Sequence, residues 1–440
     1  MYNASFFLQY EISRNSPTMN STSSSPQRHR LFKLIFVPLL TFSLLFQGAV
    51  VWTQLDDIRA GYFDFVLYYS AAKILNDGNG AQLFDLEVQR NYQKNFGRAH
   101  RDWDLPFNHP PYELLPLLPL AKFSFPVAHA LWTVISILLL ALASARLFPF
   151  LETSHRGLFV LMMLAFFPTI TALKMGQDSI ITTLLLAETF VSLKHKRYAF
   201  AGGLLALGLY KPQFVLPLLG ILVMHGRWRS ILVFLSVGLL LGAISLAMVG
   251  PDGLMGLFTL WLPMINRGHV VWPELMTNLR GLIYMALHPA GLTEATNVLT
   301  LGLSLIAYKT ALQLWPRSAE EKDELFDLRF AAAVVMTALV SFHSYSYDST
   351  LLLIPLMIML NQILKAPQPY PVRHRIFLTL LIAWFVPLVP NVLLSSALLA
   401  WWALPLPILF AVIAMEIRHR SAGRCSAIKT EDLTPIACRI

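Results

Sequence analysis

The sequence predicts an all-α polytopic membrane protein whose helices cross the bilayer about twelve times. Hydrophobic residues make up 56% of the 440-residue chain and charged residues only 13%, whereas soluble domains carry about 25% charged residues. Apolar stretches recur along the chain, and their lengths are close to the ~20 residues that a helix needs to cross the hydrocarbon core of a bilayer. Because lipid cannot satisfy exposed backbone polar groups, these stretches are expected to be helical.

One transmembrane domain is predicted over residues 31–415, between a disordered cytoplasmic tail at 1–30 and a cytoplasmic tail at 416–440. Residues 54–112 form the first extracytoplasmic loop, which contains a stretch of helical period. The predicted spans follow the apolar runs at 31–53, 114–145, 157–174, 179–193, 198–210, 214–224, 230–249, 291–315, 329–342, 349–364, 376–389 and 397–415. Several are short for a span, so these helices must borrow flanking residues or pack inside the bundle.

Charge placement orients these spans. The net charge of +9 does not indicate nucleic-acid binding, because most of the 34 lysine and arginine residues lie in short clusters between apolar runs. Such clusters mark cytoplasmic connections, and they predict a protein of the cell inner membrane with both termini in the cytoplasm. The only cysteines, Cys425 and Cys438, lie in the C-terminal tail, which argues against a disulfide framework.

With this topology, the unusual polar residues gather on the outer side of the membrane. They fall in six clusters, which are Asp64 to Ala72, Asn108 to Tyr112, Gly176 to Ser179, Tyr210 to Gln213, Asn278 to Gly281 and His343 to Asp348. The inner connections carry only basic flanks. This asymmetry predicts a functional site that opens outward.

Each cluster also has a purely structural interpretation. Asp64 is a residue type that caps helices, and His109 precedes two prolines that stiffen a turn. Gly176 to Ser179 has the residues of a helix stop and restart, while Lys211-Pro212 suits a helix start. Tyr345 and Tyr347 are typical of interfacial aromatic residues.

Other charged residues allow a second class of function. Glu188 and Lys309 lie within predicted spans, as ionisable groups of secondary transporters or lipid flippases do, although either residue could also snorkel toward an interface. Asp102-Trp103-Asp104 has an Asp-x-Asp spacing that binds divalent metals in some transferases, but so short a pattern is common by chance, and no metal is expected.

An ordered set of motifs resembles glycosyltransferase family 87. The matching residues are Asp64-Phe65-x-x-Tyr68-Tyr69-x-Ala71-Ala72, His109-Pro110-Pro111-Tyr112, Gly176-Gln177-Asp178-Ser179, Ala201-Gly202 and Lys211-Pro212-Gln213. The resemblance implies a GT-C-type helical bundle. It also implies inverting transfer of a sugar, mannose in this family, from a polyprenyl-phosphate donor on the outer face of the membrane. The acceptor would be a glycolipid or a glycan.

The same resemblance implies roles for individual residues. Asp64 would be the general base, because a positioned carboxylate can accept the proton of an attacking sugar hydroxyl. His343, Lys211 and Arg280 are the candidates for binding the donor phosphate. Candidates for binding the sugar or the acceptor are Tyr68, His109, Gln177, Asp178, Gln213, Tyr345, Tyr347 and Asp348. The scheme requires no cofactor and no metal.

Overall fold

The computed structural model describes residues 26–96, 105–267, 272–315, 325–365, 378–379, 382 and 403–429, and all regular structure in these ranges is helical. Most of the predicted span at 376–389, the Asp102-Trp103-Asp104 motif and most of the predicted tail at 1–30 lie outside the described residues. The predicted C-terminal tail is helical as far as residue 429, because the last helix continues through it.

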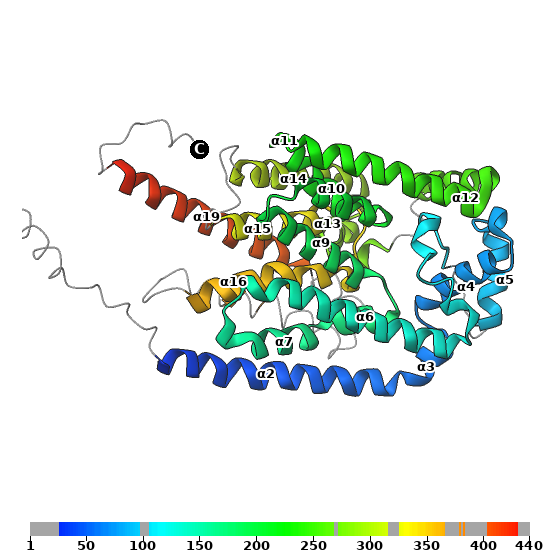
Figure 1. The fold of residues 1–440 in the computed structure, drawn as a ribbon, viewed down its shortest axis with the longest axis horizontal. Helices are drawn as coiled ribbons and strands as arrows, with labels where there is room; N and C mark the ends of the chain where they lie inside the picture. The colour runs from blue at the N-terminus through cyan, green and yellow to red at the C-terminus, as the bar shows by residue number, and fades with distance from the viewer. Residues whose placement is uncertain are drawn as a thin grey trace, which may run out of the picture.

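The helices form an elongated bundle that is capped at one end by shorter helices (Figure 1). The bundle helices are α2 (Pro26–Thr53), α6 (Phe125–Leu147), α7 (Arg156–Ala165), α8 (Phe167–Met175), α9 (Ser179–Lys194), α10 (Tyr198–Leu207), α11 (Pro212–Met224), α12 (Trp228–Arg267), α14 (Thr293–Leu314), α15 (Phe326–Val340), α16 (Leu353–Lys365) and α19 (Pro405–Lys429). The capping segments include α3 (Leu55–Arg59), α4 (Phe65–Asn76), α5 (Leu86–Phe96), η2 (Gly80–Gln82), η3 (Pro111–Leu114) and η4 (Leu120–Lys122). The described part of the first predicted loop is therefore mostly helical, apart from residues 105–110 and the short turns between its helices.

The helical membrane protein is confirmed, but the count of twelve spans is not. In the ranges that the structure describes, four segments are long and apolar enough to cross a membrane, namely Phe36–Thr53, Phe125–Phe150, Trp228–Trp261 and Ser346–Lys365. The pair α7–α8 would make a fifth span despite a bend of 52°. Helices such as α9, α10 and α11 are shorter than a span, and twelve crossings stay a prediction.

The bend between α7 and α8 follows from the sequence Phe166-Phe167-Pro168. Phe166 has an extended backbone, and Pro168 stands in the first turn of α8, where proline is tolerated because its missing N–H needs no partner. The break frees the carbonyl of Ala165, which accepts hydrogen bonds from Gln47 Nε2 at 2.9 Å and Ser43 Oγ at 3.1 Å. A neighbouring helix thus satisfies the broken backbone, as lipid surroundings require.

A second break divides α12. Gly250 has φ 70° and ψ 177°, a conformation that glycine adopts without steric cost, and Pro251 follows it. Beyond this break α12 continues past the bundle to the capping helices (Figure 1). A Cβ on Gly80 would lie 2.4 Å from the carbonyl oxygen of Met248, so η2 packs directly on the α12 backbone. The capping segments are thereby held against the bundle.

Apolar side chains are found both in the buried centre and on the outer surface, as is typical of a bundle that faces lipid. α15 and α16 occupy the centre, and nearly every side chain of α15 is buried. Large apolar side chains are instead exposed on the peripheral helices, for example Leu45 on α2, Leu239 on α12 and Val298 on α14. Because these helices are apolar on all sides, their outer faces suit lipid rather than water.

Candidate active site

The predicted polar clusters lie at the capped end of the bundle. α4, α9 and α11 all begin there, and their first residues follow Asp64, Asp178 and Lys211. Contacts among these side chains, described below, show that turns far apart in the sequence meet at one place. The predicted gathering of reactive residues at one end is therefore observed.

The Asp64 carboxylate is hydrogen-bonded to Gln177, which lies in the turn between α8 and α9. Its Oδ2 accepts a hydrogen bond of 2.8 Å from Gln177 Nε2, and Gln177 Oε1 accepts one of 2.9 Å from Tyr68 OH. Although Asp64 precedes α4, its side chain makes no capping hydrogen bond to that helix. The carboxylate is directed toward the turn between α8 and α9, and helix capping does not explain the residue.

Gly176 makes this approach of α4 possible. It ends α8 in the left-handed conformation, with φ 68°, and a Cβ at this position would lie 2.6 Å from Phe65 Cβ. Only glycine combines this backbone conformation with so close a neighbour. Its carbonyl accepts a 2.9 Å hydrogen bond from Trp132 Nε1, which ties α6 to the same turn.

Lys211 lies at the centre of a buried ionic network. Its Nζ is 2.6 Å from Asp178 Oδ1, 2.7 Å from Asp348 Oδ1 and 2.9 Å from Ser179 Oγ. Burial by itself would lower the pKa of Lys211, but the two carboxylates outweigh burial and raise it. Lys211 is therefore a permanent cation whose charge is already balanced by two carboxylates.

Glu113 is a further carboxyl group in this region, and no sequence motif indicated it. Its Oε2 lies 2.7 Å from His109 Nδ1, and only 8% of the residue is exposed. Burial and the neighbouring Asp178 raise the pKa of Glu113 well above its usual range. Burial also lowers the pKa of His109 to about 4, so the imidazole is neutral near pH 7. The available signal was a lone carboxyl residue in an apolar stretch, four residues after His109.

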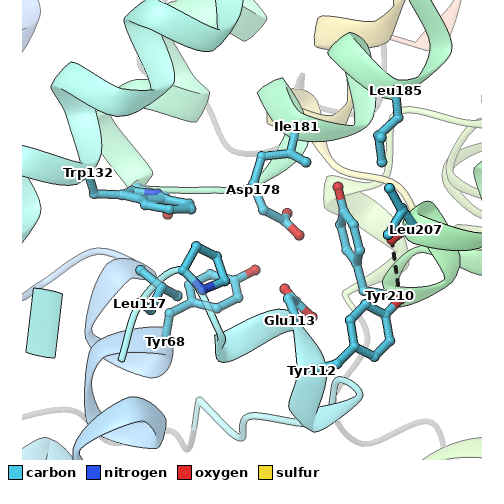
Figure 2. Close-up of a pocket in the computed structure, with 12 residues that line it drawn as sticks. Tyr68, Tyr112, Glu113, Leu117, Trp132, Asp178, Ile181, Leu185, Leu207 and Tyr210 are labelled. Atoms are coloured by element: carbon cyan, nitrogen blue, oxygen red, sulfur yellow. Dashed lines mark hydrogen bonds between the residues drawn. The ribbon is translucent and has the colours of Figure 1, made fainter. Parts of the chain in front are cut away.

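A cavity of about 200 Å³ lies between these groups. Figure 2 shows the carboxyl groups of Asp178 and Glu113 facing each other across its middle. Its remaining walls are aromatic or apolar, from Tyr68, Tyr112, Pro116, Leu117, Trp132, Gly176, Ile181, Leu185, Leu207 and Tyr210. The cavity is next to the Asp64 network, because Tyr68 belongs to both.

His109, Glu113 and Asp178 are also the residues that come closest to a metal site in the described chain. One potential ligand atom from each lies within 4.8 Å of the others. However, Lys211 Nζ occupies the cation position beside Asp178, and the His109 Nδ1 atom is bonded to Glu113. The donor set is thus engaged by an ammonium group and an imidazole, and it fits a metal poorly.

The segment from His343 to Tyr347 forms another side of the site. Gln213 Nε2 donates a 3.2 Å hydrogen bond to the His343 carbonyl. The ring centroids of His343 and Tyr345 are 4.6 Å apart, and those of Tyr345 and Tyr347 are 5.8 Å apart. Burial lowers the pKa of His343 to about 4, and the cationic neighbours Lys211 and Arg280 act in the same direction.

Arg280 lies beside this segment, in the first turn of α13 (Leu279–Leu287). Its Nη1 is 3.4 Å from the carbonyl oxygen of Phe342, a long contact that leaves its guanidinium available to a ligand. Asn278 positions the helix by accepting a 2.9 Å bond from Gly281 N and donating a 2.8 Å bond to the Ser341 carbonyl. The predicted phosphate-binding candidates His343 and Arg280 are therefore neighbours.

Glu188 and Lys309, the residues that suggested a transporter, lie elsewhere. Glu188 is ten positions along α9 from Asp178, or about 15 Å at 1.5 Å per helical residue. It forms a two-pronged ion pair with Arg146 at the end of α6. Lys309 is exposed on α14. The pairing of Glu188 and the exposure of Lys309 give the transporter hypothesis no support.

Comparison with known proteins agrees with the motifs. A model of glycosyltransferase family 87 matches residues 107–341, which is more than half of the chain. No curated protein and no solved structure matches. The matched range includes the cavity residues Glu113 and Asp178, and it ends before His343. It also begins after Asp64 and Tyr68, so the roles of these residues rest on the geometry. The chain belongs to glycosyltransferase family 87 and is a membrane glycosyltransferase.

Proposed function

We propose that this glycosyltransferase transfers mannose from a polyprenyl-phosphate donor to a glycolipid or glycan acceptor, with inversion, at the extracytoplasmic face of the inner membrane. The observation that carries the proposal is the placement of the Asp64 carboxylate. It is bound by Gln177 rather than by its own helix, and it lies beside a cavity at the polar end of an apolar bundle.

The reaction is a single displacement. The acceptor hydroxyl oxygen attacks the anomeric carbon, the bond from this carbon to the phosphate oxygen breaks, and the hydroxyl proton passes to Asp64. Polyprenyl phosphate leaves with the bonding electron pair. Attack from the face opposite the leaving group inverts the anomeric centre, and the phosphate needs hydrogen-bond donors more than an acid.

The donor phosphate is placed beside His343 and Arg280. A neutral imidazole N–H and a guanidinium group can both donate to phosphate oxygens. Lys211 was the third predicted phosphate ligand, but its charge is balanced by Asp178 and Asp348. In this proposal Lys211 positions the turns that carry the site, while His343 and Arg280 contact the leaving group.

The remaining predicted residues either contact the sugars or orient the groups that do. Gln177 connects Asp64 with Tyr68 and can exchange one of these partners for a hydroxyl group. Gln213, Tyr345 and Tyr347 stand on the His343 side of the site, where they would contact the sugar of the donor. His109, Asp178 and Asp348 hold the charged network that orients both sides.

The decisive experiment substitutes Asp64 in the purified protein. Asp64→Asn retains the size of the side chain but removes the proton acceptor, so transfer from radiolabelled polyprenyl-phosphate-mannose to membrane lipid extract should fall by about 10²–10⁴-fold. Asp57→Asn is the matched control, because Asp57 is an exposed carboxylate of the same loop. Retained transfer by Asp64→Asn, or equal loss in Asp57→Asn, would refute the assignment.

A further inference from the structure

The cavity beside Asp64 has a polar centre formed by the carboxyl groups of Glu113 and Asp178, which lie within hydrogen-bonding reach of each other. Glu113 Oε1 and Asp178 Oδ2 are buried oxygen atoms that receive no hydrogen bond from an N–H or hydroxyl group of the described residues, so only a proton on one of the two carboxyl groups can link them. The second oxygen of each group is engaged, by His109 and Lys211 respectively. Leaving buried acceptors unsatisfied costs free energy, and such atoms facing a cavity mark a place where a ligand can donate hydrogen bonds.

We propose that this cavity binds one sugar ring of the acceptor, and that Glu113 and Asp178 hold its hydroxyl groups through one shared proton. The inference rests on the proposed glycosyl transfer and adds the acceptor subsite to it. Two carboxyl groups that face each other at close range cannot both be ionised without a cation between them. With one proton on the pair, Glu113 donates to Asp178. A sugar hydroxyl group that inserts between them can accept from Glu113 and donate to Asp178, so the pair matches a hydroxyl group.

The electrostatic surroundings decide which group keeps the proton. Burial alone would raise the pKa of Asp178, but the Lys211 charge and the hydrogen bonds from Glu113 and Lys211 together outweigh burial and lower this pKa, so Asp178 stays ionised. Burial and Asp178 together raise the pKa of Glu113. The proton therefore stays on Glu113, whose other oxygen lies beside His109.

The size and the walls of the cavity suit a single ring. Pockets for drug-sized ligands begin at about 300 Å³, and this cavity measures about 200 Å³. The aromatic side chains offer flat apolar surfaces to the C–H faces of a pyranose, and they come from Tyr68, Tyr112, Trp132 and Tyr210 (Figure 2). Apolar walls with a few convergent polar groups are the usual form of a small-molecule site.

Charge assigns the cavity to the acceptor rather than to the donor. The donor carries a phosphate next to its sugar, and the ionised Asp178 would repel this group. An acceptor sugar presents only hydroxyl groups there. Tyr68 lines the cavity and is linked to Asp64 through Gln177, so a ring in the cavity has its neighbouring hydroxyl close to the base. Leu207, which is 42% exposed, supplies an apolar rim for the lipid part of a glycolipid.

The test separates acceptor binding from catalysis. Radiolabelled octyl pyranosides (α-mannoside, α-glucoside and β-galactoside) are bound to the protein in nanodiscs, and affinity for polyprenyl-phosphate-mannose is measured in parallel. Glu113→Leu should weaken the affinity for the preferred pyranoside at least tenfold, since a hydrogen bond to an ionised pair is lost, with a change of less than twofold for the donor. Glu113→Gln should stay within threefold of the wild type, because an amide reproduces the protonated carboxyl.

Two further variants keep the test interpretable if Glu113→Leu does not fold, and they separate pyranoside binding from sugar transfer. Leu207→Trp fills the cavity from its rim without altering a carboxyl group, and it should weaken pyranoside binding even if Glu113→Leu does not fold. Asp64→Asn should bind the pyranoside normally while transfer is lost. If the wild type binds a pyranoside but transfers no mannose, the donor assignment fails and the sugar subsite is supported. Absence of pyranoside binding by the wild type, equal weakening of donor binding, or a Glu113→Gln as weak as Glu113→Leu would overturn the inference.

Discussion

Removal of the Lys211 ammonium should destabilise the capped end of the bundle and do so in a pH-dependent manner. Lys211→Met keeps the length of the side chain but leaves Asp178 and Asp348 buried beside each other without a cation. These carboxyl oxygens lie 2.6 Å and 2.7 Å from Lys211 Nζ, and both residues are almost fully buried. Breaking a buried ion pair by removing one partner costs about 3–5 kcal/mol.

The carboxyl groups themselves set an upper limit to this loss. A carboxylate with an ordinary pKa of about 3.9 can be protonated at pH 7 for about 4 kcal/mol, so the variant will not lose more than this for each group. In the variant, burial raises the folded pKa of Asp178 above its unfolded value. The contribution of Asp178 to the free energy of unfolding is then fully present below its pKa in the unfolded state. It is lost as pH rises through its pKa in the folded state.

In the wild type, the contribution of Asp178 to stability should change with pH in the opposite direction. There the folded pKa of Asp178 is lowered, so its contribution is present above the unfolded pKa and is lost only as pH falls through the folded pKa. Between pH 8 and pH 5 the wild type should therefore change little in this contribution. The variant should regain stability over the same range, by up to about 1.4 kcal/mol per pH unit for one proton.

The measurement is the free energy of unfolding in mixed micelles of mild detergent and dodecyl sulfate, at pH 5, 6, 7 and 8. Lys309→Met is the matched control, because Lys309 is an exposed lysine on α14, and its effect should stay within ~0.5 kcal/mol. Adding Asp348→Asn to Lys211→Met should restore at least half of the loss. If Lys211→Met lowers the free energy of unfolding by less than ~1 kcal/mol, or by the same amount at pH 5 and pH 8, then the ion pairs of Lys211 with Asp178 and Asp348 do not hold the site together.

Four other outcomes follow from the geometry. His343→Ala should lower kcat/KM for the donor by about 10²-fold or more. Because burial lowers the pKa of His343 to about 4, the wild-type rate should show no His343 titration between pH 6 and pH 8. An inflection near pH 6.5 in the wild-type rate that disappears in His343→Ala would refute this expectation. Glu188→Gln should leave sugar transfer in proteoliposomes unchanged, because Glu188 pairs with Arg146 away from the site. Treatment with EDTA should leave transfer unchanged, because Lys211 occupies the cation position beside Asp178. Gly202→Ala should destabilise the protein by about 1–3 kcal/mol in the micelle assay, because its Cβ would lie 2.0 Å from the Ser230 carbonyl oxygen.

The helical class and the position of the site could be predicted because both depend on local sequence. Apolar runs in lipid must be helical, and a polar turn such as Gly176 to Ser179 has few reasons to exist inside a membrane unless its residues are used. The structural interpretation of Gly176 was also correct, since it does end α8 in the left-handed conformation. Its neighbours Gln177 and Asp178 nevertheless contact Asp64 and Lys211, so one turn both ends α8 and carries candidate site residues.

The partners within the site could not be predicted, because they depend on long-range packing. Nothing in the sequence indicates that Lys211 meets Asp178 and Asp348, which are 33 residues before it and 137 residues after it. The same holds for Glu113, which appears as a lone carboxyl residue in an apolar stretch until α9 places Asp178 opposite it. The count of twelve spans stays a prediction, since α9, α10 and α11 are each shorter than a span.

The ion network explains how short helices can hold a precise site at the end of a bundle. Lys211 begins α11, Asp178 precedes α9, and Asp348 lies in η10 (Ser346–Leu352) before α16. One ammonium group therefore joins three turns, and the neighbours of these turns include further candidate site residues: Gln177, which contacts Asp64, and Tyr345 beside His343. Because buried charges tolerate few geometries without a large penalty, the network fixes the distance between Asp64, the proposed base, and the groups proposed to bind phosphate. A glycosyl transfer that needs both at once then depends on Lys211 even if Lys211 never contacts the donor.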